Sequence, residues 1–298
     1  MIIRFLLKII LELSTVFTTS YANFFIENSL ISYAKRLKQA RENKPAKLVA
    51  IFGSSFNPTT LGHIDFIRML LAPQSGPITS VCVIPAGQSP LKDPQDYASV
   101  ADRLQILKLV LKAQLTAIEQ VNIRIDLIEM QRNTPSWMIV TISALIIQNR
   151  ARESYILACG YDHLPLMRQW YRWTEFANLC TLYFYPRQGV DIVSLTAADT
   201  CLALCRAKIA ITIWFVDPVI QQRFSTLCQE NCDAEEWPVL ASYLHLKHWS
   251  GCTVRASSAS EIRDFYHHSG SRPAQIPAGL SPEAHEYIVT HHCYTLFK

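Results

Sequence analysis

The sequence has little charge, no basic run and no internal repeat. Charged residues make up 17% of its 298 residues and apolar residues make up 50%, so a disordered chain is excluded and a sizeable core is allowed. A net charge of +4 is too weak to indicate a nucleic-acid partner, although it suits small anionic substrates. The length is sufficient for one large domain or two small ones.

An apolar run long enough to cross a membrane is also missing. Residues 1–17 are mostly apolar, but Arg4, Lys8 and Glu12 interrupt them along one helical face. The longest uncharged run in this region, Leu13–Ile26, is too short for a membrane-spanning helix. The same charges argue against a signal peptide.

Three interpretations of this N-terminal stretch remain open. Residues 1–26 could lie on a membrane or a partner as an amphipathic helix, which we do not favour. They could instead form an extra helix packed on the domain, or be translated from an over-long gene model. Residues 27–46 are polar and are expected to form a helix that ends in a linker. We treat residues 1–46 together as an N-terminal helical extension.

Nine cysteines, an odd number, are spread through a chain that is too large to need disulfide bonds. They predict free thiols in a reducing compartment, which favours the cytoplasm. Cys201 with Cys205, and Cys228 with Cys232, have the i,i+4 spacing that places both sulfurs on one helical face. Zinc binding by these four is an alternative, but structural zinc sites more often use C-x₂-C. We favour small buried apolar residues and assign no metal ligand among the protein side chains.

The segment KLVAIFGSSFNPTTLGH, residues 47–63, joins a buried strand to the start of a helix. Residues 48–52 are apolar and rich in β-branched side chains, which predicts a strand buried on both faces. Small residues and Asn57-Pro58 then form a turn, and residues 64–71 have helical spacing. His63 and the first amides of this helix would face the carboxyl end of a parallel sheet, where α/β folds bind phosphates. A βα turn that binds nothing is the alternative.

Further strands and one amphipathic helix are predicted downstream. Apolar or alternating runs predict strands at residues 78–85, 121–127, 154–159 and 180–186, with a further candidate at 209–215. Residues 100–115 read as an amphipathic helix with Arg103 in its first turn. Lys92 lies in the loop after the second strand, at the same predicted sheet edge as His63.

Polar and aromatic residues follow the fourth predicted strand. Gly160 allows a ligand to approach the backbone, and Asp162 is placed to accept hydrogen bonds from ribose hydroxyls. Trp170 and Trp173 follow on a predicted helix, where one of them is expected to join the core. A flat indole is a suitable stacking partner for a planar ligand, and we assign that role to Trp170 and the core position to Trp173.

A second phosphate-binding pattern occurs near the C-terminal end of the chain. Ser258 and Ser260 begin a predicted helix, and Arg263 lies in its first turn. Amides, hydroxyls and a guanidinium would converge there on one anion. Read alone, the spacing of Ser258 and Glu261 also fits a helix capping box.

The motifs, in their order along the chain, resemble the nucleotidyltransferases related to nicotinate- and nicotinamide-nucleotide adenylyltransferase. The first signature, with its (H/T)-x-G-H pattern, appears as GSSFNPTTLGH ending in Thr60-Leu61-Gly62-His63. Five further patterns of the family follow in order. They are P-x₄-P-H-K ending at Lys92, E-x-x-R-x-G-x-S-Y-T at residues 129–138, G-x-D at Gly160–Asp162, R-x-G at Arg187–Gly189 and S-S-T-x-I-R at residues 258–263. Leu91, Met138 and Ala259 depart from the family's His, Thr and Ser.

The resemblance implies a fold and a reaction. The expected fold is α/β, with a Rossmann-like, doubly wound, mainly parallel sheet and helices on both faces, preceded by the N-terminal helical extension. Residues 47–298 would form the nucleotidyltransferase domain, with an atypical segment at 190–250 to which we assign no chemistry. The expected reaction transfers AMP from ATP, with Mg²⁺, to nicotinate mononucleotide, and gives deamido-NAD and pyrophosphate in NAD biosynthesis.

The resemblance also implies site residues. The catalytic set is His63, Thr60, Lys92 and Arg263. The ATP-binding set is Gly53, Ser54, Ser55, Phe56, Gly62, His63, Gly160, Asp162, Arg187, Ser258, Ser260 and Arg263. The set that binds the pyridine nucleotide is Asn57, Ser136, Trp137, Met138 and Trp170.

Two alternatives to this function are kept. One is a related adenylyl- or cytidylyltransferase of the same fold that uses nicotinamide mononucleotide or another phosphate. The spacing of Trp170 after the G-x-D motif resembles bacterial enzymes and favours nicotinate. The other is a nucleotide-binding protein without turnover, which the three departures and the 190–250 segment suggest. The oligomeric state is left open.

Overall fold

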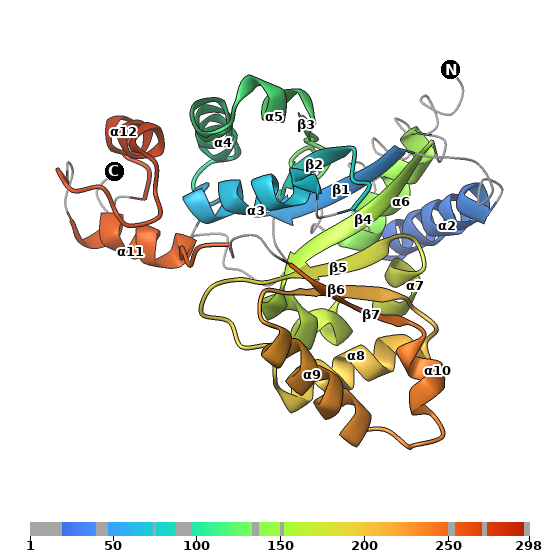
Figure 1. Ribbon diagram of the computed structural model, residues 1–298. Coiled ribbons are helices and arrows are strands. Elements are labelled where there is room, and N and C mark those ends of the chain that lie inside the picture. Colours follow the sequence, from blue (N-terminus) through green and yellow to red (C-terminus); the bar gives the residue numbers. More distant parts are fainter. Residues whose placement is uncertain are drawn as a thin grey trace.

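The computed structural model describes residues 20–39, 47–73, 76–87, 97–132, 137–149, 152–249, 254–269 and 273–294. Within these residues, seven strands form one sheet in the order β3-β2-β1-β4-β5-β6-β7, and all neighbours are parallel (Figure 1). The strands are β1 (Lys47–Ser54), β2 (Ser80–Pro85), β3 (Ile123–Ile125), β4 (Glu153–Gly160), β5 (Thr181–Tyr185), β6 (Ile211–Phe215) and β7 (Leu244–His248).

Helices cover both faces of this sheet. One core contains buried residues of α2 (Ser20–Gln39), α6 (Met138–Gln148), η3 (Tyr161–Gln169), α7 (Trp173–Ala177), α8 (Leu195–Arg206), α9 (Pro218–Glu230) and α10 (Trp237–Ala241). The other contains residues of α3 (Leu61–Leu71), α4 (Val100–Gln114), α11 (Ala259–His268) and α12 (Pro282–Thr290). The short α5 (Ala117–Val121) buries none of its residues.

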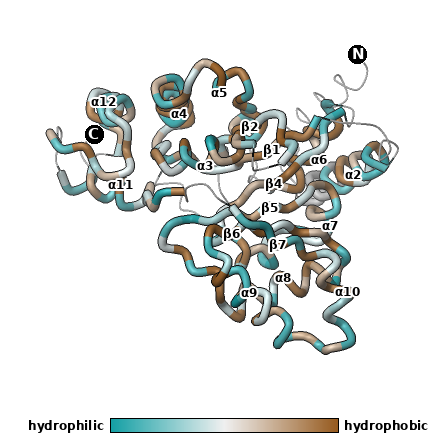
Figure 2. Tube along the Cα trace, in the orientation of Figure 1, coloured by the Kyte–Doolittle hydropathy of each residue, from teal (hydrophilic) through white to brown (hydrophobic). Residues whose placement is uncertain are grey.

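The sequence of β1 accounts for this arrangement. Val49 and Ile51 belong to the first core, whereas Ala50 and Phe52 belong to the second, so successive side chains enter opposite layers. A strand buried on both faces must be apolar throughout, as the run at 48–52 is. Figure 2 shows hydrophobic residues along β1 and β4, in the middle of the sheet. The expected Rossmann-like, doubly wound fold is confirmed.

The strand order reverses between β1 and β4. The chain passes from β1 outward to β2 and β3, and then returns to place β4 on the other side of β1. The loops that follow β1 and β4 therefore diverge and leave a crevice at the carboxyl ends of these strands, which is where doubly wound sheets bind ligands.

The N-terminal helix α2 packs beside α6 (Figure 1). It spans Ser20–Gln39 and so begins before residue 27, where the helix was expected to start. Leu30, Ile31 and Ala34 lie in the first core, so this part of the extension is integrated with the sheet domain. No helix in the described residues is long and apolar enough to cross a membrane. The three interpretations of residues 1–26 apply mainly to residues 1–19, which lie outside the described part.

The atypical segment at 190–250 extends the sheet. It supplies α8, the predicted strand at 209–215 as β6, then α9, α10 and the edge strand β7. The sequence analysis did not identify β7, because the segment LHLKH contains only two apolar residues and, among the described strands, it pairs with β6 alone.

The cysteine pairs differ from the prediction in one case. Cys201 and Cys205 are both buried on α8, as expected, but α9 ends at Glu230, so Cys232 does not share a helical face with Cys228. Cys201 interacts with the thiols of Cys205 and Cys228, and burial raises the pKa of Cys201. Among the described residues, no group of three or more His, Cys, Asp and Glu side chains could hold a metal ion. The cysteines of this cluster pack as small core residues.

The third predicted strand is also shorter than expected. The alternating run at 121–127 forms a strand only over Ile123–Ile125, and Val121 ends the short helix α5. The Thr116 hydroxyl and the Glu119 carboxylate form a capping box at the start of α5, and this local signal overrides the alternation.

Candidate active site

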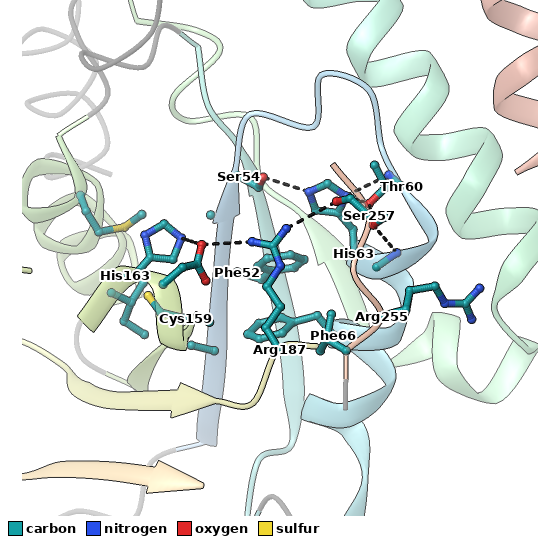
Figure 3. Close-up of a pocket in the computed structure, with 18 of the residues that line it drawn as sticks. Phe52, Ser54, Thr60, His63, Phe66, Cys159, His163, Arg187, Arg255 and Ser257 are labelled. Carbon is teal, nitrogen blue, oxygen red and sulfur yellow. Dashed lines mark hydrogen bonds and ion pairs between the residues drawn. The ribbon is translucent and has the colours of Figure 1, made fainter. Parts of the chain in front are cut away.

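A cavity opens at the carboxyl ends of β1 and β4, at the reversal of strand order (Figure 3). The residues that line it come from β1, β4, α3, η3 and the start of α6, and from the chain next to α3, after η3, after β5 and before α11. They are Phe52, Gly53, Ser54, Thr60, Gly62, His63, Phe66, Met138, Leu157, Ala158, Cys159, Gly160, Asp162, His163, Trp170, Arg187, Val254, Arg255 and Ser257.

The loop between β1 and α3 is held from behind by two buried arginines. Arg103 is 1% exposed and donates to the backbone oxygens of Ser55, at 2.8 Å, and Ala86, at 2.7 Å. Arg263 is 8% exposed and donates to the backbone oxygen of Asn57 at 2.8 Å. Burial lowers the pKa of Arg103 from its ordinary value. These guanidinium groups satisfy loop carbonyls and so fix the shape of the turn.

The side chain of Asn57 serves the same purpose. Its amide oxygen accepts hydrogen bonds from the Tyr294 hydroxyl at 2.8 Å and from the backbone N–H of Ala98 at 3.1 Å. Asn57 is 2% exposed and does not line the cavity. The structure therefore places it behind the loop, although the sequence analysis assigned it to the pyridine nucleotide.

His63 lies in the first turn of α3 with one ring nitrogen fixed by Thr60. Its Nδ1 accepts the backbone N–H of Thr60 at 2.9 Å and lies 2.8 Å from Thr60 Oγ1. Because an amide nitrogen can only donate, Nδ1 must be the unprotonated nitrogen of the neutral ring and Nε2 must carry the proton. Nε2 lies 3.1 Å from the Ser54 hydroxyl, on the cavity side (Figure 3).

The imidazole is also fixed by packing. Its ring centroid lies 4.9 Å from that of Phe56 and 5.8 Å from that of Phe52. Phe56 is fully buried in the left-handed region, with φ of 46°, which turns the chain sharply after β1. The ring of His63 therefore has aromatic partners on its apolar surface and hydrogen bonds at both nitrogens.

Gly62 permits a close approach from the other end of the domain. A Cβ at this position would lie 2.4 Å from Ser257 Oγ and 3.0 Å from the backbone oxygen of Arg255. The Gly62 N–H instead donates to Ser257 Oγ at 3.2 Å. This contact gives a steric reason for the glycine in Thr60-Leu61-Gly62-His63.

The end of β4 supplies a carboxylate paired with an arginine. Arg187 Nη1 lies 3.0 Å from Asp162 Oδ2, and the side chains are 37% and 36% exposed. The second oxygen, Asp162 Oδ1, is buried and has no hydrogen-bond partner among the described residues. A Cβ at Gly160 would lie 2.5 Å from this oxygen, so glycine is required there for the carboxylate to keep its place.

Aromatic and apolar side chains form the opposite wall. Trp170 is half-buried, lines the cavity, and lies 6.0 Å from the ring of His163. Met138 lines the cavity as well, with its terminal carbon 2.7 Å from where a Cβ of Gly53 would lie. Trp173 is partly buried against the first core. Trp137 packs on Tyr171 with ring centroids 5.0 Å apart and does not line the cavity.

The structure thus brings together many of the predicted site residues. Those that line the cavity are Gly53, Ser54, Thr60, Gly62, His63, Met138, Gly160, Asp162, Trp170 and Arg187. Ser55, Phe56, Asn57, Trp137, Ser258, Ser260 and Arg263 lie outside the lining. Of these, Ser258 caps α11 by accepting the Glu261 N–H, and Ser260 accepts a hydrogen bond from Arg263. Lys92 and Ser136 lie outside the described residues.

Sequence reasoning missed the segment just before α11. Val254 pairs with Arg187 in a parallel bridge, and its oxygen accepts the Gln188 N–H at 2.9 Å. The segment then crosses the cavity edge, where Arg255 forms an ion pair with Asp65 and Ser257 contacts α3. The only signal in the sequence was its position directly before the serine-rich motif.

Comparison with known sequences and structures finds many similar proteins, of which three are described. A cytidylyltransferase-like family model matches residues 51–256. A "Probable nicotinate-nucleotide adenylyltransferase" of Legionella pneumophila (strain Corby) is 34% identical over 141 residues, 47% of this chain and 62% of that protein. A "Nicotinate-nucleotide adenylyltransferase" of Bacillus subtilis (strain 168) is 27% identical over 146 residues, 49% of this chain and 72% of that protein. The match to the Legionella protein thus spans less than two thirds of its length.

The third is a solved structure, a nicotinic acid mononucleotide adenylyltransferase of Plasmodium falciparum complexed with APC. It has a TM-score of 0.52 and 14% sequence identity, and the alignment covers 83% of this chain and 97% of that chain. At this identity the likeness supports the fold alone.

Proposed function

The chain belongs to the cytidylyltransferase-like family, and we propose that it transfers AMP from ATP to nicotinate mononucleotide. The products are deamido-NAD and pyrophosphate, in a step of NAD biosynthesis. The observation that carries this proposal is the geometry of His63, whose Nε2 faces the cavity at the carboxyl ends of β1 and β4. The names of the Legionella and Bacillus relatives support the choice of substrates. We assign the activity to residues 47–298.

The reaction needs positioning and charge stabilisation more than acid–base chemistry. An oxygen of the mononucleotide 5′-phosphate attacks the α-phosphorus of ATP, and the bond from that phosphorus to the bridging oxygen of the β-phosphate breaks. Its electron pair leaves with pyrophosphate. Because the attacking phosphate is already ionised at neutral pH, no general base is required. His63 Nε2–H donates to an α-phosphate oxygen as negative charge accumulates there.

Thr60 holds His63 in the protonation state that this step requires. Its backbone amide and hydroxyl both face Nδ1, which leaves Nε2 as the donor. The hydroxyl group of Ser54 lies 3.1 Å from Nε2, and we propose that a phosphate oxygen of ATP replaces it as the partner of Nε2. Thr60 therefore acts on the reaction through His63.

Positive charge at the cavity comes from Arg187 and Arg255, which both line it. We propose that they attract the triphosphate together with Lys92. Arg263 does not line the cavity, and it supports the site by donating hydrogen bonds to the Asn57 oxygen and the Ser260 hydroxyl. Ser258 caps the helix α11 that carries Arg263. Mg²⁺ would enter with ATP as part of the substrate and would neutralise phosphate charge there.

The remaining residues divide between the two nucleotides. Asp162 Oδ1, which is buried without a partner among the described residues, is suited to accept a ribose hydroxyl above Gly160. Trp170 is suited to stack on the pyridine ring, with Met138 beside it in the same wall. Gly53 lines the same cavity, and Met138 fills the space where its Cβ would lie. The free thiols of the described cysteines support a reducing compartment, and we place the protein in the cytoplasm.

A pyrophosphate-release assay tests the proposal. The full chain is incubated with ATP and Mg²⁺, in parallel with nicotinate mononucleotide and nicotinamide mononucleotide. We expect release with both or with nicotinate alone, faster with nicotinate, and loss of release in His63→Ala. Release only with other phosphate substrates would identify a sister transferase. Tight ATP binding without release would identify a nucleotide-binding protein without turnover.

A further inference from the structure

Ser257 joins two groups at the start of α3 through its hydroxyl. Ser257 Oγ accepts the N–H of Gly62 at 3.2 Å and donates to Thr60 Oγ1 at 2.8 Å (Figure 3). Thr60 Oγ1 in turn lies 2.8 Å from His63 Nδ1. The three contacts form one chain of hydrogen bonds that begins at a backbone amide of α3 and ends at the imidazole.

The direction of this chain is fixed at both ends. The Gly62 amide can only donate, so the Ser257 hydroxyl must turn its own proton elsewhere, and Thr60 Oγ1 is the acceptor in reach. His63 Nδ1 already accepts the Thr60 amide and has no proton to donate, so the Thr60 hydroxyl is the donor in its contact with Nδ1. The Ser257 proton fills a lone pair of Thr60 Oγ1 and so favours this orientation of the hydroxyl. A hydroxyl proton that would otherwise rotate freely is thereby held in one orientation.

We propose that Ser257 is a positioning residue for His63, acting through Thr60. By directing the Thr60 hydroxyl proton at Nδ1, it reinforces the imidazole tautomer whose Nε2–H points into the cavity. The role rests on the proposed adenylyl transfer, in which that N–H meets the α-phosphate. Ser257 lies outside the set of residues that the sequence analysis assigned to the site.

The backbone around Ser257 is fixed from three sides. A Cβ at Gly279 would lie 2.6 Å from Ser257 Cβ, and Gly279 has a φ of +81°. The oxygen of Gly279 accepts the N–H of Leu61 at 2.7 Å, which ties this turn to the first residue of α3. Arg187 Nη2 donates to the Ser257 oxygen at 3.4 Å. The hydroxyl is therefore presented to Thr60 from a close-packed slot.

A purely structural role for Ser257 predicts a different result from a positioning role. If the hydroxyl only satisfies the Gly62 amide, Ser257→Ala lowers stability and leaves the imidazole tautomer unchanged. If it positions His63, Ser257→Ala changes the tautomer and the turnover number while substrate binding is retained. The two roles can be separated because one readout does not depend on activity.

The experiment uses the full chain labelled with ¹⁵N-histidine, in wild type, Ser257→Ala, Thr60→Val and the double variant. The His63 signals, assigned by their loss in His63→Ala, should report the Nε2–H tautomer in wild type and a larger share of the other in Ser257→Ala. We expect kcat to fall about tenfold in Ser257→Ala with KM for ATP within about twofold. The double variant should be no slower than Thr60→Val, because Ser257 acts through Thr60.

Ser194→Ala is the matched control. The Ser194 hydroxyl also accepts a backbone amide, from Ala197 at 3.3 Å, but it caps α8 away from the cavity. This variant should leave the His63 signals and kcat unchanged. Unchanged His63 signals in Ser257→Ala, or additive effects in the double variant, would overturn the proposal. If wild type transfers no AMP, the proposed function fails, and the tautomer signals alone still decide the role of Ser257.

Discussion

Arg263 donates a hydrogen bond to the backbone oxygen of Asn57 across 206 positions of the sequence, at 2.8 Å. The guanidinium is almost fully buried and also contacts Ser260. The sequence analysis placed Arg263 on the ATP phosphates, whereas its observed partners belong to the protein. This difference leads to the first prediction.

Arg263→Ala should weaken the fold and the reaction together. Loss of a buried charged hydrogen bond is expected to lower the free energy of unfolding by about 2–3 kcal/mol, measured by urea denaturation. Because the loop before α3 loses the hydrogen bond from Arg263 to the Asn57 oxygen, His63 is held less firmly. We therefore expect kcat to fall while KM for ATP changes little. An unchanged unfolding free energy with a strongly raised KM for ATP would mean that Arg263 binds phosphate directly.

His63→Ala should lower kcat by about a hundredfold to a thousandfold, as expected for a donor to developing oxyanion charge. His63→Gln retains an N–H donor and should recover part of this loss. Circular dichroism and the affinity for ATP serve as controls, and both should match wild type. Equal activity in His63→Ala and wild type is the outcome that would remove His63 from the mechanism.

Trp170→Ala should affect one substrate selectively. Loss of an aromatic stacking partner is expected to raise KM for nicotinate mononucleotide about tenfold, with KM for ATP nearly unchanged. Trp173→Phe is the comparison, since Trp173 packs against the same core as Trp170 but does not line the cavity, and it should alter stability without changing either KM. A larger change in KM for ATP than for the mononucleotide would place Trp170 at the other nucleotide.

Helix α2 should contribute measurably to stability. Ile31 is 1% exposed in the first core, and Ile31→Ala is expected to lower the free energy of unfolding by about 2–4 kcal/mol. Tyr33→Ala, on the exposed side of the same helix, should change it little. Equal effects of the two substitutions would show that α2 does not pack on the domain in solution.

The junction between α2 and α7 should make stability depend on pH in the acid range. Hydrogen bonds from Arg172 and Lys35 lower the pKa of Glu175 from the ordinary 4.5 to about 2. A carboxylate with a lowered folded-state pKa stabilises the fold above its ordinary pKa, and this contribution disappears as the pH falls towards 2. Wild type should therefore be more stable than Glu175→Gln above pH 4.5, and the difference in their free energies of unfolding should shrink as the pH falls from 4.5 towards 2. The free energies come from urea denaturation at each pH. A difference between the two proteins that stays constant from pH 4.5 to pH 2 would contradict the lowered pKa of Glu175.

The parts of the fold that follow from local patterns were predictable. The buried strand at 48–52, the helix from residue 100 and the phosphate-type loop each depend on residues that are adjacent in the chain. The edge strand β7 was missed, because an edge strand needs few apolar residues. The end of α9 at Glu230 was missed, because no proline or glycine comes directly after it to mark the end of a helix. Ser257 was missed for another reason, since its partners at Gly62 and Thr60 are close only after the chain has folded.

The loop before α3 is held by hydrogen bonds to residues that the ribosome adds much later. Residues 53–63 contain the first signature of the site, yet Asn57 is bonded to Arg263 and Tyr294, and Leu61 to Gly279. A growing chain therefore exposes this signature long before the residues that brace it exist, and such non-local closure is slow. The nascent protein should remain inactive until its last helices have been translated and docked. A chain that stops before α11 should have the signature and no working site.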